Sequence, residues 1–339
     1  MPFEVENHAT LSGGTPLRSP MSTGARIVAL IKAIRAVVKA ALWRPALRLL
    51  LASNRRAGLV LVYHDVGDRD GDSRSELVPP ISRARFARQL VHLGRYYRPV
   101  ELTDLQAAVA TRRRGEPFPV SLTFDDDLGH HASHAMPELA RASMPGTFFL
   151  CGSFLTEPSD FWWQRLQRAV DHGVDVTALL GDGDIHRRGQ AMEALTPQQR
   201  EAVAETLGEL APPVPAAEVL TSEDAARLPY VGFHTVHHHP LTGLDDAQLQ
   251  RALTEGRDGL GSVAGYPVDT IAYPHGSWDR RVVEAARDSR FSIGVTCERE
   301  AVTPDSDPLA MGRYEPPVRA SIGEFAFDLA RTLLKSPTA

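Results

Sequence analysis

From residue 59 onward, short apolar runs alternate with longer segments of helical periodicity. The runs with β-strand composition are 59–64, 120–124, 146–152, 230–235, 270–274 and 291–296. Because these runs are apolar along their whole length, we expect strands that are buried on both faces, as in a mainly parallel sheet or barrel. The pattern therefore predicts an α/β protein in which helices cover parallel strands.

The segment from about 155 to 222 breaks this alternation. It begins with FWWQRLQRAV and continues through pieces rich in Gly, Asp and Pro. We interpret it as an insertion that packs beside the functional site of a single domain spanning residues 57–335. A domain of this length corresponds to one α/β barrel of about 250 residues with an addition.

The first 56 residues form a different region. Residues 1–25 are rich in Ser, Thr, Pro and Gly and lack periodicity, which predicts a flexible tail. Residues 26–52 predict a basic amphipathic helix, because three basic side chains fall within about 60° on a helical wheel: Lys32, Arg35 and Lys39. This helix either lies on an anionic membrane surface, with Trp43 at the interface, or packs its apolar face on the body of the protein. Pro45 is expected to kink or restart the helix.

Charge and hydropathy restrict the compartment and the partners. No apolar run approaches the roughly 20 residues that span a bilayer, and no signal peptide can be read. We therefore expect a cytoplasmic protein or one at the periphery of a membrane. Residues 1–56 contain nine Lys or Arg and two Glu, whereas the remainder contains 28 basic and 40 acidic residues. Such an acidic body argues against nucleic acid as the main partner, because phosphate binding needs a positive surface.

Polar residues gather where the predicted strands end. TFDDD places Asp125, Asp126 and Asp127 directly after one strand, and FHTVHHH follows a later one. Strand ends are where barrels and open sheets carry their chemistry. His234 and His238 have the spacing at which side chains meet on a helical turn, and one Asp with two His is a common set of ligands for a divalent metal. The alternative is an acidic turn that caps the next helix.

Four segments together resemble the polysaccharide deacetylases of the NodB-homology type, carbohydrate esterase family four: SLTFDDD, GTFFL, GFHTVHHHPL and IAYPHG. The similarity covers about residues 57–335. Leu241 stands seven residues after His234, as in the second motif of the family, and this spacing selects His238 as the second ligand. The resemblance implies a distorted (β/α)7 barrel and the metal-dependent removal of acetyl groups from an N-acetylated sugar.

The resemblance also implies a role for each residue of the site. Asp126, His234 and His238 would hold the divalent metal, for which zinc is expected first, although cobalt, nickel and manganese suit the same ligands. Asp125 would be the general base toward a water molecule that the metal activates. The metal and a backbone N–H of the YPHG turn, that of His275, would stabilise the oxyanion of the tetrahedral intermediate.

Two features depart from the family pattern. IAYPHG lacks the Arg that orients the catalytic Asp in many members, and no histidine follows His275 to protonate the leaving amine. In the branch that acts on exopolysaccharides, an N-terminal Tyr-His motif supplies this histidine, so His64 is the preferred general acid and His275 the second candidate. The alternative role of His64 is a structural bond to a nearby carboxylate. MGRYEP resembles a late strand of that branch, which would pair Arg313 with an active-site acid, whereas His237 and His239 are expected in a solvated loop.

Three functions follow from these residues. The expected one is N-deacetylation of an N-acetylhexosamine-containing polysaccharide or of a glycan precursor. The same site could instead hydrolyse another amide or ester, such as an O-acetyl ester or a cyclic imide. The third is a non-catalytic, membrane-attached glycan-binding protein, which has no need of the complete Asp and His set. Trp162 and Trp163 either stack on a sugar or pack the insertion.

Overall fold

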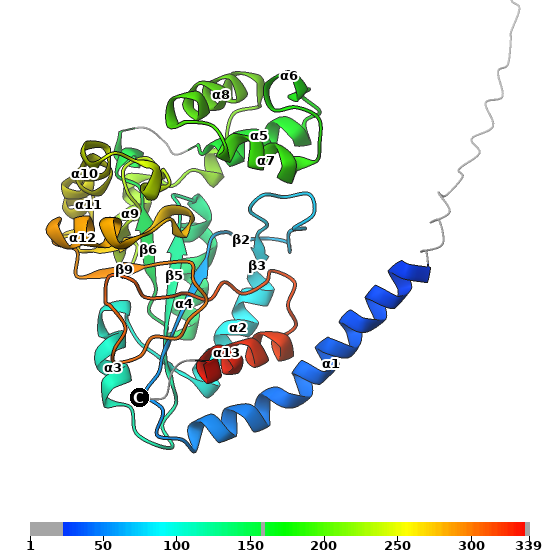
Figure 1. The fold of residues 1–339 in the computed structure, drawn as a ribbon, viewed down its shortest axis with the longest axis vertical. Helices are drawn as coiled ribbons and strands as arrows, with labels where there is room; N and C mark the ends of the chain where they lie inside the picture. Colours follow the sequence, from blue (N-terminus) through cyan, green and yellow to red (C-terminus); the bar gives the residue numbers. More distant parts are fainter. Residues whose placement is uncertain (1–22, 157–159, 336–339) are drawn as a thin grey trace, which may run out of the picture.

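The computed structural model describes residues 23–156 and 160–335. Residues 1–22 of the predicted flexible tail lie outside the described residues. The first helix, α1 (Thr23–Leu51), begins at residue 23. The remainder is an α/β fold in which helices surround a parallel sheet (Figure 1).

Seven strands form the main sheet, and every pairing between them is parallel. In spatial order they are β1 (Leu59–Tyr63), β5 (Pro119–Asp125), β6 (Thr147–Leu150), β7 (Val231–Phe233), β8 (Thr270–Ala272) and β9 (Ile293–Val295), with β4 (Arg98–Pro99) paired to β5. The six predicted strands are all present and buried along their length, which confirms the distorted barrel. The sequence pattern missed β4 because two residues carry no periodicity. A separate small sheet pairs β2 (Val66–Gly67) with β3 (Ile81–Ser82).

The barrel is closed by a segment that is not a regular strand. Met311 forms an isolated parallel bridge with Val295 of β9, and Tyr314 forms one with Leu61 of β1. Arg313 lies between these two bridges, and its side chain is fully buried. The MGRYEP segment therefore joins the two edges that an open sheet would leave exposed.

Helices cover the outside of the strands (Figure 1). The longer ones are α2 (Arg83–Tyr96), α3 (Leu105–Thr111), α4 (Met136–Ala142), α10 (Asp246–Thr254), α11 (Arg257–Ala264), α12 (Arg280–Asp288) and α13 (Ile322–Lys335). Short 3-10 turns are η1 (Leu102–Asp104), η3 (Gly152–Leu155), η4 (Ala216–Glu218), η5 (Leu241–Gly243) and η6 (Pro274–Gly276). A π-helical turn, η2 (His131–Ala135), precedes α4. Such turns are rare and frequently occur at functional sites.

The predicted insertion forms a group of helices beyond the strand ends. Its helices are α5 (Trp162–Asp171), α6 (Thr177–Leu180), α7 (Ile185–Glu193) and α8 (Pro197–Leu210), and α9 (Ser222–Ala225) begins where the insertion was predicted to end. In Figure 1, α5 to α8 lie together at the top of the molecule, whereas α9 lies against the main body. Leu166, Met192 and Leu207 are fully buried in an apolar cluster separate from the core of the sheet. The insertion therefore packs as a small helical lobe around its own core.

α1 is one helix that passes through Pro45, so the predicted restart at this residue is wrong. Its C-terminal half packs against the body, where the ring of Trp43 meets that of Tyr96 edge-on at 5.1 Å. Lys39 Nζ lies 3.1 Å from Asp328 Oδ2 on α13. Packing on the body, rather than a membrane interface, thus explains the position of Trp43. Among the described helices, none is both long and apolar enough to cross a membrane.

Candidate metal and catalytic centre

Three consecutive aspartates at the end of β5 have different partners. Asp125 is the last residue of the strand, and Asp126 turns the chain with a positive φ of 73°. Asp127 accepts a hydrogen bond of 2.8 Å from the backbone N–H of Cys151. All three aspartates are buried. A positive φ is unfavourable for a residue that carries a Cβ, so the surrounding structure must hold this turn, as is common at functional sites.

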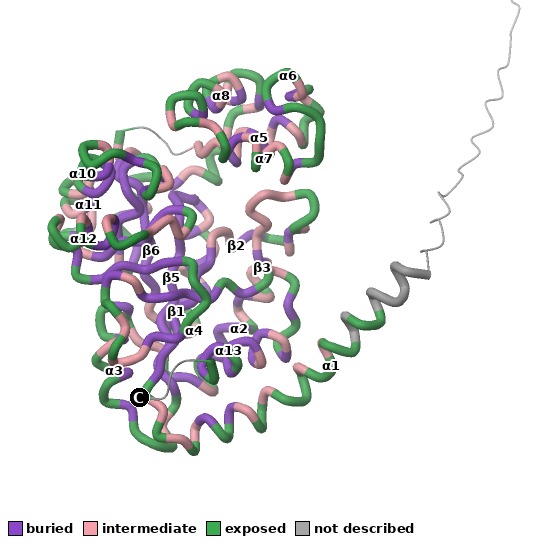
Figure 2. The backbone as a smooth tube through the Cα atoms, in the orientation of Figure 1, coloured by how far each residue is buried: buried purple, intermediate pink, exposed green. Residues whose placement is uncertain are grey.

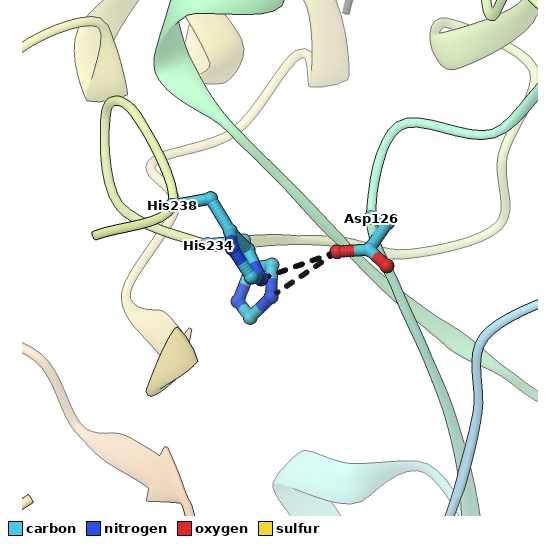
Figure 3. A group of neighbouring side chains, drawn as sticks. All are labelled: Asp126, His234 and His238. Atoms are coloured by element: carbon cyan, nitrogen blue, oxygen red, sulfur yellow. Dashed lines mark ion pairs between the residues drawn. The ribbon is translucent and has the colours of Figure 1, made fainter. Parts of the chain in front are cut away.

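Asp126, His234 and His238 come together, as the motifs predicted (Figure 3). Asp126 Oδ1 lies 3.6 Å from Nε2 of His234 and 3.3 Å from Nε2 of His238. His234 directly follows β7, and a positive φ of 55° at His238 brings its ring back over that of His234, with the ring centroids 4.7 Å apart. One nitrogen or oxygen atom from each residue lies within 4.8 Å of the others. The carboxylate and the two imidazoles thus converge on one point.

An unsatisfied carboxylate oxygen in this group fits a cation. Asp126 Oδ1 is buried and has no hydrogen-bond partner in the described chain, and Nε2 of His238 faces it. His234 Nδ1 lies 2.9 Å from the carbonyl oxygen of Ala272. Because a carbonyl only accepts, Nδ1 carries the proton and Nε2 keeps a free lone pair on the side of Asp126.

Electrostatics point to the same conclusion. Burial, together with the negative charges of Asp125 and Asp127, raises the pKa of Asp126 to about 7. Burial also lowers the pKa of His234 to about 4, so this imidazole is neutral at neutral pH. A divalent ion would favour both the ionised carboxylate and the neutral ring, which are the forms that bind metal.

Aromatic side chains enclose the second histidine of the group. The ring centroid of His238 lies 4.7 Å from that of Trp163, 4.7 Å from that of His275 and 5.4 Å from that of Phe161. Trp163 is buried and stacks on Phe161 at 4.3 Å, whereas Trp162 is partly exposed, and both tryptophans line the adjacent cavity. The insertion therefore reaches the metal-type group and helps to position His238.

Asp125 is held by a residue 188 positions away in the chain. Nη1 and Nη2 of Arg313 donate hydrogen bonds of 2.6 and 2.7 Å to its two carboxylate oxygens. Burial alone would raise the pKa of Asp125, but the charge of Arg313 lowers this pKa well below its ordinary value. Arg313 thus pairs with Asp125, as the MGRYEP resemblance predicted.

His64 forms a second charged pair. Its Nδ1 lies 3.3 Å from Oε1 of Glu315. Burial would lower the pKa of His64, but the negative charge of Glu315, with smaller contributions from Asp126 and Asp125, raises it to about 9. His64 is therefore protonated at neutral pH. Glu315 was not predicted from the sequence. Its place two residues after Arg313 was a usable signal, because side chains at i and i+2 of an extended chain point to the same side.

A further histidine of the site that was not predicted from the sequence is His131, in the π-helical turn after the aspartates. His131 Nε2 lies 2.8 Å from the carbonyl oxygen of Asp125 and 2.9 Å from that of Asp126. Both carbonyls accept, so Nε2 must carry the proton, and burial lowers the pKa of His131 to about 4, which keeps the ring neutral. This side chain fixes the backbone at the turn that separates the two carboxylates.

One cavity of about 430 Å³ joins these groups. Its lining includes all six residues that the sequence analysis assigned to the site: His64, Asp125, Asp126, His234, His238 and His275. His275 is exposed and has a positive φ of 56° within η6. The neighbouring His237 and His239 line a separate cavity of about 620 Å³ between the insertion and α10. They are thus not part of the metal-type group.

The family model described as "Polysaccharide deacetylase" matches residues 112–178 and 216–293, and the gap between these ranges falls in the insertion. A provisionally named polysaccharide deacetylase of Bacillus subtilis (strain 168), YxkH, is 20% identical over 266 residues, which are 78% of this chain and 71% of YxkH.

Two solved structures share the fold. The Streptococcus pyogenes deacetylase PplD, in complex with acetate, superposes with a TM-score of 0.53 at 16% identity, over 83% of this chain and 99% of PplD. The Bacillus cereus polysaccharide deacetylase BC0361 superposes with a TM-score of 0.55 at 17% identity, over 81% of this chain and 69% of BC0361. These two likenesses show the shared fold, and the motifs, the family model and the Bacillus subtilis relative show that the chain belongs to the polysaccharide deacetylase family, carbohydrate esterase family four, and is a deacetylase hydrolase.

Proposed function

We propose that this enzyme removes N-acetyl groups from an N-acetylhexosamine-containing carbohydrate, with Asp125 as general base and His64 as general acid. The observation that carries the proposal is a single cavity in which an ionised carboxylate and a protonated imidazole both border the Asp126, His234 and His238 group. Hydrolysis of an amide needs one group that accepts a proton and one that donates a proton, and these two side chains are in opposite protonation states at the same pH.

Asp125 fits the role of base because it is ionised and fixed in orientation. Arg313 engages both of its oxygens, which keeps the carboxylate charged but weakens it as a base toward ordinary water. A divalent ion held by Asp126, His234 and His238 would supply Lewis acidity, which eases the deprotonation of water and polarises the acetyl carbonyl. Zinc is the expected ion, since imidazole and carboxylate ligands suit it, and cobalt, nickel and manganese suit the same set.

His64 fits the role of acid because Glu315 keeps it protonated. As a water molecule adds to the carbonyl carbon of the acetyl group, Asp125 takes a proton from that water molecule. The C–N bond then breaks, acetate leaves, and the sugar nitrogen takes a proton from His64 to become an amine. The backbone N–H of His275 is the proposed donor to the developing oxyanion. The side chain of His275 is the weaker candidate for the acid, since it has no acidic partner in the part of the chain that the structure describes.

The charge of the cavity favours a neutral glycan. Apart from the histidines, its ionisable lining side chains are carboxylates, the phenol of Tyr63 and the thiol of Cys297, and no Lys or Arg lines it within residues 23–156 and 160–335. A phosphate or carboxylate on the substrate would be repelled by Asp65, Glu193 and Glu315, whereas an N-acetylhexosamine unit carries no charge. We therefore favour a polysaccharide, such as an exopolysaccharide, over a phosphorylated glycan precursor.

The proposal is tested by measuring acetate release from purified, zinc-loaded protein. We expect acetate and a free amine from N-acetylglucosamine oligomers, and little product from acetylated xylan or a cyclic imide. Asp125→Asn should lower turnover roughly 10³-fold, because a positioned base contributes about 10² to 10⁴. Its metal content should stay unchanged, whereas Asp126→Asn should lose both metal and activity.

Two results would reject this assignment. Faster release from acetylated xylan than from the sugar oligomers would identify an O-acetyl esterase. Full activity of Asp125→Asn would show that this carboxylate is not the base. A protein that binds the glycan without hydrolysing it, and that binds it equally well as Asp125→Asn, would show the same.

A further inference from the structure

The first helix has two apolar faces, and only one of them is covered. On the covered face, Leu47 and Leu50 are buried against the body, and Trp43 packs on α2. Gly323 of α13 lies so close to Ala40 that a Cβ at Gly323 would approach the Ala40 Cβ to 2.7 Å. This face therefore anchors α1 to α13 and α2.

The opposite face of α1 carries large apolar side chains that are exposed: Leu30, Ile31, Ile34, Val37, Val38, Leu42 and Leu49. Val37 is 68% exposed and Leu49 is 73% exposed. At about 100° per residue, the seven positions fall within an arc of about 140° that is centred opposite the covered face. Figure 2 shows exposed positions along the described part of α1, both where the helix projects from the body and where it packs on it. Arg48, which is also exposed, falls in the same arc, and a row of exposed apolar side chains with basic neighbours is typical of an interaction site.

The charges of α1 identify the kind of partner. The sequence Thr23–Leu51 contains six Lys or Arg and no Asp or Glu. Arg35 and Arg44 flank the apolar arc on its two edges, and both are exposed and form no ion pair with any described residue. Two copies of this helix packed face to face would bring rows of like charge together, whereas anionic headgroups would neutralise them.

We infer that the exposed face of α1, defined by Leu30, Ile31, Ile34, Val37, Val38, Leu42 and Leu49, binds the surface of an anionic membrane. The apolar side chains enter the boundary between headgroups and acyl chains, and the flanking arginines contact the headgroups. The opposite face stays on α13 and α2, so the helix joins the catalytic domain to the lipid surface. This attachment is independent of the proposed deacetylation.

Vesicle flotation of the full chain tests the inference. We expect binding to phosphatidylcholine vesicles that contain phosphatidylglycerol, and much weaker binding to phosphatidylcholine alone. The double variant Ile34→Glu, Val37→Glu should lose binding by tenfold or more. Val91→Glu on α2 replaces an equally exposed valine, 71% exposed, outside the row, and it should bind as the wild type does. Arg35→Gln and Arg44→Gln should each weaken binding to the anionic vesicles about fivefold.

Thermal unfolding midpoints equal to that of the wild type would show that all the variants are folded. The vesicle test does not depend on whether the protein deacetylates sugars. Equal binding to neutral and anionic vesicles, or no binding to either, would overturn the inference. A dimer of the wild type in vesicle-free buffer, measured by light scattering, together with a monomeric Ile34→Glu, Val37→Glu variant, would also overturn the inference. The exposed face of α1 would then be an interface between two copies.

Discussion

The two charged pairs of the cavity differ in their access to solvent. The side chains of Arg313 and Asp125 are 0% and 3% exposed, whereas those of His64 and Glu315 are 27% and 66% exposed. Water cannot replace either partner of the buried pair, so its charges are fixed, while solvent screens the exposed pair. Asp125, the proposed base, thus stays ionised over a wide range of pH. The pKa of His64, the proposed acid, is set by Glu315, which can be replaced without disturbing the fold.

The largest effect is expected from breaking the buried pair. Arg313→Met leaves Asp125 as an unpaired charge in the barrel, which should lower the free energy of unfolding by about 3 kcal/mol. Activity should fall roughly 10³-fold, because the base loses its orientation and its ionised state. Denaturant unfolding and acetate release measure the two effects.

Two further variants sharpen this result. Arg280→Met removes one partner of an exposed ion pair on α12, with Glu284, and should leave the midpoint of denaturant unfolding unchanged, because solvent screens this pair. The double variant Arg313→Met, Asp125→Asn should be more stable than Arg313→Met alone, since no uncompensated charge remains. Equal stability of the single and double variants would contradict the importance of the buried charge.

A smaller loss is expected from the exposed pair. His64→Gln removes the proposed acid and should lower turnover roughly 10²-fold, as for a positioned proton donor. Stability should stay close to that of the wild type, because His64 is partly exposed. If a substrate with a better leaving group than an amine recovers the lost rate, His64 acts on the leaving group. Wild-type turnover in His64→Gln would transfer this role to another residue.

The smallest change should come from Glu315→Gln, through the pH dependence. His64 must be protonated to act, and its raised pKa keeps it protonated until the pH rises through about 9. Without Glu315 the pKa of His64 falls, so turnover should decline at lower pH and be roughly tenfold below the wild type at pH 8. Turnover at pH 6 should be nearly unchanged. Glu284→Gln, a distant exposed acid on α12, should leave the profile where it is.

The residues that local patterns could identify are those at strand ends. Parallel pairing places the ends of β5 and β7 at one edge of the sheet, so Asp126, His234 and His238 had to meet once these strands were recognised. The strands themselves were recognisable because burial on both faces requires continuous apolar runs. For this reason the fold and the metal-type group were both predictable from sequence.

The residues that were missed depend on contacts between distant parts of the chain. Glu315 meets His64 only because Tyr314 bridges to β1, a contact that leaves no periodic pattern. His131 reaches the carbonyl oxygens of Asp125 and Asp126 through a π-helical turn, which residue spacing alone does not predict. On α1, wheel position could not show which apolar face the body would cover, nor that Lys39 would pair with Asp328 of the body while Arg35 stays exposed.

The isolated bridges of Met311 and Tyr314 make the barrel weakest at its seam. Regular strands release their amide protons only when large units open, whereas two single bridges can part by themselves. If the two bridges part, the guanidinium of Arg313 moves away from the carboxylate of Asp125 while the other strands stay paired. We therefore expect heat inactivation of this enzyme to be a local event that precedes melting of the barrel.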